Sequence, residues 1–114
     1  MSDCIFCKIA NGEIPTDTVY ENELVRAFRD ADPQAPTHVL VVPKRHVQSV
    51  SQLTQEDGAL MLAMLDAIQA VVKSEGIEES GYRCVANTGE QGGQSVPHLH
   101  VHVLGGRDLK WPPG

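Results

Sequence analysis

His98-Leu99-His100-Val101-His102-Val103-Leu104 carries the strongest structural signal in the chain. Histidine and apolar residues alternate strictly, as in a β-strand, where successive side chains point to opposite faces of the sheet. The three histidines are therefore expected on one face and the apolar residues between them on the other. At a rise of about 3.3 Å per residue, neighbouring histidines lie roughly 6.6 Å apart. Two of them can therefore act on one phosphate or one metal ion.

Further strands are predicted by short runs of β-branched and apolar residues. The predicted strands are residues 18–20 and 24–29, paired as a hairpin, and residues 38–42, 82–87 and 98–104. Residues 30–36 contain two prolines and are expected to form a loop, and the first twelve residues a turn with about one turn of helix.

One long helix is predicted over residues 55–75. Thr54 can cap it, Asp57 stands three residues later as in a capping box, and Gly76 can end it. Apolar residues spaced by three and four are expected to form one buried stripe, at positions 60, 61, 64, 65, 68, 71 and 72. Residues 1–114 are therefore predicted to form a single α+β domain, in which this helix crosses a largely antiparallel sheet of about five strands.

Composition excludes several classes of protein. The formal net charge of −6 disfavours a nucleic-acid partner, because such binding relies on many Lys and Arg contacts to phosphates. The chain has neither a signal-peptide pattern at its start nor a run of about 20 apolar residues, so a cytoplasmic protein without a membrane partner is expected. In that reducing compartment, Cys4, Cys7 and Cys84 are expected to be metal ligands or core thiols, with Cys84 in the core.

A glycine-rich loop, residues 88–95, leads into the histidine strand. Glycines allow consecutive backbone N–H groups to face one concavity, which suits phosphate oxygens, and the Ser95 hydroxyl can add a donor. Three of the five histidines on one face beside such a loop indicate a chemical site rather than a chance arrangement.

The histidine strand resembles the motif of the histidine triad family. The resemblance extends over nearly the whole chain and points to the Hint branch, through residues 28–30, 33–38, 42–44, 92–96, 104–107 and the ending Trp111-Pro112-Pro113-Gly114. It implies a homodimer that hydrolyses purine nucleoside phosphoramidates through a covalent nucleotidyl-histidine, releasing AMP or GMP, with no cofactor needed for catalysis.

The same resemblance implies a role for individual residues. His100 would be the nucleophile, supported by His38 and His102. The other substrate-binding residues implied are Asp30 for the ribose, Asn87, Gly93, Gln94 and Ser95 around the phosphate, and Trp111, whose tail would reach the partner's active site and help select the amine. The chemistry agrees, because neutral imidazole is a competent nucleophile near pH 7 and a protonated His102 could stabilise phosphoryl charge.

Cys4 and Cys7 have the two-residue spacing of thiolates that share a tetrahedral zinc ion. The resemblance to zinc-containing bacterial members implies His46 and His98 as the other two ligands of a structural zinc. A redox pair is the competing function, although the Ile-Phe insert and the lack of a following βαβ pattern disfavour it.

Other functions remain open at this stage. His98, His100 and His102 could instead ligate a catalytic metal, although no carboxylate or fourth histidine stands at an obvious ligand spacing. The chain could also be a nucleotide-binding scaffold, or a dinucleoside polyphosphate hydrolase, which residues 104–107 and the Trp111 ending disfavour.

Overall fold

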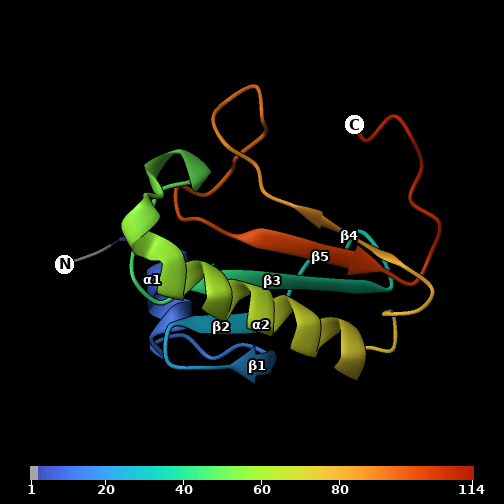
Figure 1. The fold of residues 1–114 in the computed structure, drawn as a ribbon, viewed down its shortest axis with the longest axis horizontal. Helices are drawn as coiled ribbons and strands as arrows, with labels where there is room; N and C mark the ends of the chain where they lie inside the picture. Colours follow the sequence, from blue (N-terminus) through green and yellow to red (C-terminus); the bar gives the residue numbers. More distant parts are fainter. Residues whose placement is uncertain (1–2) are drawn as a thin grey trace.

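The structure, a computed structural model, describes residues 3–114. Its centre is one antiparallel sheet in the order β1-β2-β3-β5-β4 (Figure 1). The strands are β1 Thr18–Glu21, β2 Val25–Arg29, β3 Thr37–Pro43, β4 Tyr82–Val85 and β5 Val101–Gly105. The helices are α1 Ile5–Ala10, the 3₁₀ turns η1 Val50–Gln52 and η2 Gln55–Asp57, and α2 Gly58–Ser74. The predicted α+β class, with a five-stranded antiparallel sheet and one long helix, is confirmed.

The central strand β3 is buried along its whole length, as its run of β-branched residues predicts. Its side chains point alternately into two apolar clusters. On one face, α2 lies across the sheet (Figure 1), and Val39 and Val41 belong to the cluster beneath it. On the other face, Leu40 and Val42 pack with Phe6 and Ile9 of the short helix α1. The sheet is thus covered on both sides near its middle, where the histidines lie.

The start of α2 follows from its capping residues. Thr54 and Asp57 form the predicted capping box, and the residues between them take a 3₁₀ turn before the α-helix begins at Gly58. The helix ends at Ser74, and Gly76 follows with a φ of +71°. The prediction of a helix over residues 55–75 is therefore right except for its first turn.

The buried stripe of α2 is narrower than predicted. Leu60 and Met64 are buried on it, whereas Met61 and Leu65 are 44% and 47% exposed. A single sheet can cover only one side of a helix. The prediction that residues 61 and 65 belong to the buried stripe is wrong for this chain taken alone.

The strand β5 begins at Val101, so the prediction of a strand from residue 98 is wrong. Pro43, at the end of β3, has no N–H to donate to a neighbouring strand. Its carbonyl lies 2.9 Å from Nε2 of His98, and the backbone N–H of Leu99 donates to the Val47 carbonyl at 2.6 Å. Over residues 98–100, hydrogen bonds to the His98 side chain and to a loop carbonyl therefore replace the backbone hydrogen bonds that would join two strands.

The alternation between the two faces survives the loss of ladder bonds. Leu99 packs in the cluster under α2, whereas the rings of His98 and His100 meet Phe6 on the opposite face at centroid distances of 6.1 and 5.0 Å. Periodicity thus predicted which way these side chains point, although it did not predict their hydrogen bonds.

At the edge of the sheet, β4 ends at Val85, two residues before the predicted end. Its Cys84 is exposed, so the prediction of a core thiol is wrong. An edge strand has a neighbour on one side only, and α2 packs against β1, β2 and β3 rather than against β4. Over residues 3–114, none of the helices has the length and apolar character needed to cross a bilayer.

Candidate active site

Three of the predicted catalytic residues lie together. His38 comes from β3 and His102 from β5, and Nε2 of His38 lies 2.9 Å from Nδ1 of His102. The ring of His100, just before β5, has its centre 5.0 Å from that of His102. His38 and His100 are buried, and His102 is half-buried. The site therefore combines shielded imidazoles with one that reaches the surface.

The orientation of His100 is fixed by its own backbone neighbourhood. Its Nδ1 lies 2.7 Å from the carbonyl oxygen of His98, and because a carbonyl only accepts, this nitrogen carries the hydrogen. In the neutral ring, Nε2 is then left with its lone pair. The edge-to-face contact with Phe6 holds the ring from the side.

His38 is held by the loop that precedes its strand. The backbone N–H of Gln34 donates to Nδ1 of His38 at 3.0 Å. The predicted ribose ligand Asp30 lies on the same loop, with Oδ2 3.4 Å from Nε2 of His38 and Oδ1 accepting from the backbone N–H of Asp32. The structure thus brings Asp30 to the histidines, as the predicted shared site requires.

The protonation state of His102 differs from the expectation. Burial, together with the neighbouring His100 and His38, lowers the pKa of His102 from 6.5 to about 4. The ring is therefore neutral near pH 7 in the free protein, rather than protonated. It offers one N–H to a ligand instead of a full charge.

The glycine-rich loop is folded by its own side chains. Nδ2 of Asn87 donates to the Gly92 carbonyl at 2.6 Å, and Gly93 has a φ of +78° that favours glycine. Gln94 braces the loop, because its Nε2 donates to the carbonyls of Gln48 and Val96 at 2.7 and 3.0 Å. Ser95 is exposed next to a cavity of about 400 Å³.

The two cysteines meet the two histidines that the family resemblance assigned to zinc. Sγ of Cys4 lies 3.2 Å from Nδ1 of His98, and Sγ of Cys7 lies 3.2 Å from Nδ1 of His46 and 3.4 Å from Nδ1 of His98. All four ligand atoms lie within 4.8 Å of one another. Four donors this close fit the tetrahedral S₂N₂ set of a structural zinc ion.

The surroundings of His98 also suit a metal ligand. Its Nε2 lies 2.9 Å from the Pro43 carbonyl, and such outer hydrogen bonds orient the rings of metal-binding histidines. Burial lowers the pKa of His98, which favours the neutral ring that binds metals. The direction of His98 disfavours a catalytic metal shared with His100 and His102, since its Nδ1 faces the cysteines instead.

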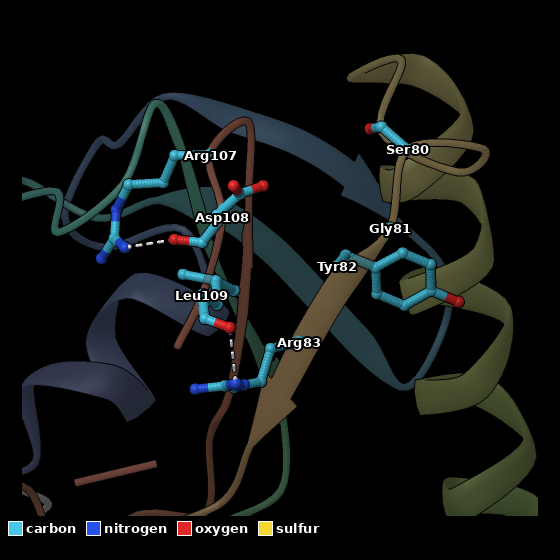
Figure 2. A pocket seen from close by; sticks show the side chains of 7 residues that line it. All are labelled: Ser80, Gly81, Tyr82, Arg83, Arg107, Asp108 and Leu109. Atoms are coloured by element: carbon cyan, nitrogen blue, oxygen red, sulfur yellow. Dashed lines mark hydrogen bonds between the residues drawn. The ribbon is translucent and has the colours of Figure 1, made fainter. Parts of the chain in front are cut away.

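Trp111 lies apart from these groups on the C-terminal tail, residues 108–114, and is 81% exposed. Figure 1 shows the tail running past the edge strand β4. Nη2 of Arg83 on β4 donates to the carbonyls of Leu109 and Lys110 at 3.1 and 3.0 Å, and Figure 2 shows the first of these bonds. Within one chain the tail is thus tied to β4.

Comparison with known proteins places this geometry in a family. The HIT domain matches residues 11–109. The chain belongs to the histidine triad (HIT) family. It is 53% identical over 112 residues to an uncharacterised HIT-like protein of Synechococcus elongatus, covering 98% of this chain and 97% of that protein. It is also 45% identical over 107 residues to the purine nucleoside phosphoramidase of Escherichia coli K12, covering 94% of this chain and 90% of that protein.

Solved structures of HIT proteins share the fold. A HIT family hydrolase from Legionella pneumophila superimposes with a TM-score of 0.95 at 46% identity, covering 98% of this chain and all of that chain. A histidine triad protein from Clostridium difficile superimposes with a TM-score of 0.92 at 44% identity, covering 96% of each chain. Membership of the HIT family therefore rests on sequence and on fold.

Sequence reasoning missed several residues that shape the site. Phe6 supports two histidine rings, and its position between two cysteines gave no hint of that contact. The backbone of Gln34, which donates to His38, was noted only as part of a family motif. Hydrogen bonds made through backbone groups leave no mark on the residue type, so no sequence signal could have revealed Gln34.

Proposed function

We propose that this HIT protein is a hydrolase of purine nucleoside phosphoramidates, the conjugates of AMP or GMP with an amine. The observation that carries the proposal is His100, whose Nδ1 is bonded to a carbonyl so that Nε2 keeps its lone pair. The 45% identity to a protein named purine nucleoside phosphoramidase supports the same activity.

The proposed reaction has two displacements at the α-phosphorus. In the first, Nε2 of His100 forms a bond to phosphorus, and the phosphorus–nitrogen bond to the amine breaks. The amine leaves as it takes up a proton from solvent, while the N–H at Nε2 of His102 donates a hydrogen bond to the departing nitrogen. In the second, water attacks phosphorus, the bond to His100 breaks, and the proton released by water goes to solvent. A covalent intermediate divides one difficult displacement into two easier ones.

The remaining predicted residues would bind the substrate. Gly93, Gln94 and Ser95 belong to the loop that we propose for the phosphate, and Asn87 directly precedes it. Loops of this kind bind anions through backbone N–H groups. Gln94 would act mainly by bracing that loop, since its side-chain amide bonds to backbone carbonyls. Asp30 would accept hydrogen bonds from the ribose hydroxyls.

We also propose that a structural zinc ion is bound by Cys4, Cys7, His46 and His98. The close approach of their ligand atoms supports this ligand set. The ion would link α1 to the segment before β5 without taking part in the reaction. Zinc thiolates persist in a reducing compartment, which agrees with the predicted cytoplasmic location.

A homodimer is the proposed assembly. The outer edge of β4, which carries the exposed Tyr82 and Cys84, is available to pair with a second copy. The exposed Met61 and Leu65 of α2 are apolar side chains that a second copy could cover.

The proposed function is tested by His100→Ala. The variant should lose hydrolysis of an adenosine phosphoramidate while it still binds AMP and unfolds cooperatively. Retention of even a tenth of the wild-type kcat/KM, a loss of about 1.4 kcal/mol, would remove His100 from the central role. Assays of the wild type with a dinucleoside polyphosphate in parallel distinguish a phosphoramidate hydrolase from a dinucleoside polyphosphate hydrolase. Binding of AMP without turnover of either substrate would indicate a nucleotide-binding scaffold.

A further inference from the structure

We infer that Arg107 is a positioning residue that, through the backbone of Gln34, sets which ring nitrogen of His38 and of His102 carries the hydrogen. The inference rests on the proposed function for what His102 does to the substrate. The link between Arg107 and the rings of His38 and His102 follows from hydrogen-bond geometry alone and does not depend on the proposed function.

The first step is the bond between Arg107 and the loop. Nε and Nη2 of Arg107 both donate to the carbonyl oxygen of Gln34, at 3.3 and 3.0 Å. Nη1 donates to the carbonyl of Asp108 at 3.0 Å, the bond drawn in Figure 2. A planar guanidinium with all three nitrogens engaged has a fixed orientation, so it holds the Gln34 carbonyl in place and restrains the backbone on both sides of that residue.

A close backbone approach supports the same loop. Gly106 has a φ of +89°, and a Cβ atom there would lie 2.8 Å from Cβ of Pro36. The chain after β5 therefore packs directly against the loop that precedes β3. Arg107 acts across this tight contact, between segments that are far apart in the sequence.

The second step passes from Gln34 to His38. The backbone N–H of Gln34 can only donate, and it meets Nδ1 of His38 at 3.0 Å. Nδ1 must therefore be the bare nitrogen of the neutral ring, and the hydrogen must lie on Nε2. The structure thus selects one of the two neutral forms of His38.

The third step passes from His38 to His102. The hydrogen on Nε2 of His38 points to Nδ1 of His102 at 2.9 Å, closer than Oδ2 of Asp30 at 3.4 Å. Nδ1 of His102 accepts, so the hydrogen of the neutral His102 ring lies on Nε2. This is the nitrogen that the proposed reaction needs as a donor.

Loss of the bond from Arg107 to the Gln34 carbonyl should change which nitrogen of the His102 ring carries the hydrogen. If the backbone of Gln34 moved and its N–H turned away, His38 could carry its hydrogen on Nδ1 and accept through Nε2. His102 would then donate to His38 through Nδ1 and present a bare Nε2 to the substrate. A hydrogen-bond donor would be replaced by an acceptor at the place where phosphoryl oxygen or the departing amine needs a donor.

The experiment is nitrogen-15 NMR of histidine-labelled protein without substrate, which reports whether each ring nitrogen carries hydrogen. In the wild type we expect bare Nδ1 and protonated Nε2 on both His38 and His102. In Arg107→Ala, and in Gln34→Pro, which removes the N–H itself, we expect a mixture of the two forms on both rings. Gln34→Ala keeps the N–H and the carbonyl and should keep the wild-type forms.

Two further variants separate positioning from general loosening. Arg83→Ala removes another arginine that holds carbonyls of the C-terminal tail, and it should leave both rings unchanged. Arg107→Lys keeps one donor for the Gln34 carbonyl and should restore most of the wild-type signal. If Arg107→Ala keeps both rings in their wild-type forms, or if Arg83→Ala perturbs them equally, the inference is wrong.

Kinetics give an independent measurement. Arg107→Ala should lower kcat on the phosphoramidate about tenfold with KM within about twofold, because loss of one positioned hydrogen-bond donor to a transition state costs roughly 10²–10³-fold in rate and the variant would keep the donor in part of its molecules. An equal loss in kcat and in AMP affinity would instead indicate a damaged binding site and would contradict the inference. Failure of the proposed function would appear separately, as activity retained by His100→Ala, and would leave the NMR result unaffected.

Discussion

At the scale of single residues, burial disfavours protonation of two histidines, His98 and His102, before any ligand arrives. The pKa of His102 falls to about 4 and that of His98 is also lowered, in both cases chiefly because burial disfavours the charged ring. His100 is held with Nδ1 as donor by a carbonyl. The ring of His102 is therefore neutral at neutral pH, and the bond to the carbonyl directs Nε2 of His100, the proposed nucleophile, away from the backbone.

The lowered pKa of His102 predicts how stability depends on pH. The unfolded ring titrates near 6.5 and the folded ring near 4, so the unfolded chain binds more protons between these values. The contribution of His102 is complete above about pH 6.5 and is lost as the pH falls toward 4. Because the ring is half-exposed, we expect this loss to be about 1–2 kcal/mol rather than the full value of the shift.

Urea unfolding at pH 7, 6 and 5 measures this dependence. The variant His102→Gln should show a shallower fall in the free energy of unfolding than the wild type, and the difference isolates His102 from carboxylates that titrate in the same range. Parallel curves for the two proteins would show that burial of His102 does not oppose its protonation.

Gly92 offers a second prediction at this scale. A Cβ atom there would collide with the carbonyl oxygen of Thr88, whereas the space beside Gly58 on α2 is open. Gly92→Ala should therefore shift the loop, break the bond from Asn87 and weaken AMP binding by about tenfold or more, a loss of about 1.4 kcal/mol. Gly58→Ala, the matched control, should leave AMP binding unchanged and stabilise the helix by roughly 0.5–1 kcal/mol. Calorimetric titration with AMP distinguishes these outcomes.

At the scale of elements, the sequence predicted what periodicity and capping determine. The hairpin of β1 and β2, the strand β3 and the helix α2 all follow from local patterns. Local patterns could not predict the burial of a side chain where that burial depends on which other strand or helix packs against it. Cys84 lies in a short run that was predicted as a strand, yet it is exposed because β4 lies at the edge.

The segment before β5 shows the same limit for the site. Its alternating residues predicted opposite faces correctly, but residues 98–100 leave the ladder because Pro43 opposes them and His98 reaches its carbonyl. The sequence could suggest which side chains share the site. The hydrogen bonds of Gln34 and Arg107 could not be predicted from the sequence, because they involve backbone groups of a loop that is distant in the chain.

The zinc proposal gives a prediction for the elements that the ion would join. Purified protein should contain about one zinc ion per chain, and Cys4→Ser and Cys7→Ser should each lose it. Both variants should unfold at a lower temperature, because metal binding is linked to folding, while some phosphoramidase activity remains. Elemental analysis and thermal unfolding provide the measurements. Protein that lacks metal when purified under reducing conditions would contradict the ligand set, and complete loss of activity with an unchanged unfolding temperature would favour a catalytic metal.

At the scale of the whole molecule, the site is assembled from segments that span the chain. His38 comes from β3, Phe6 from α1 and His102 from β5, and the loop of residues 88–95 lies between β4 and β5. The C-terminal tail is the exception, since Arg83 holds it along the edge strand. A tail on the edge at which the dimer is proposed to form is well situated to reach a partner.

The position of the tail predicts that residues 111–114 affect the choice among amines but not the affinity for the nucleotide. If Trp111 covers the leaving group in the partner's site, deletion of residues 111–114 should change kcat/KM unequally across a series of amines, while AMP affinity stays nearly constant. An exposed indole next to two prolines has little to pack against in its own chain, so the deletion should alter the unfolding temperature only slightly. A uniform factor for every amine would show that the tail only supports the fold. Sedimentation as a monomer at micromolar concentration would exclude the contact between subunits, because Trp111 could then act only within its own chain.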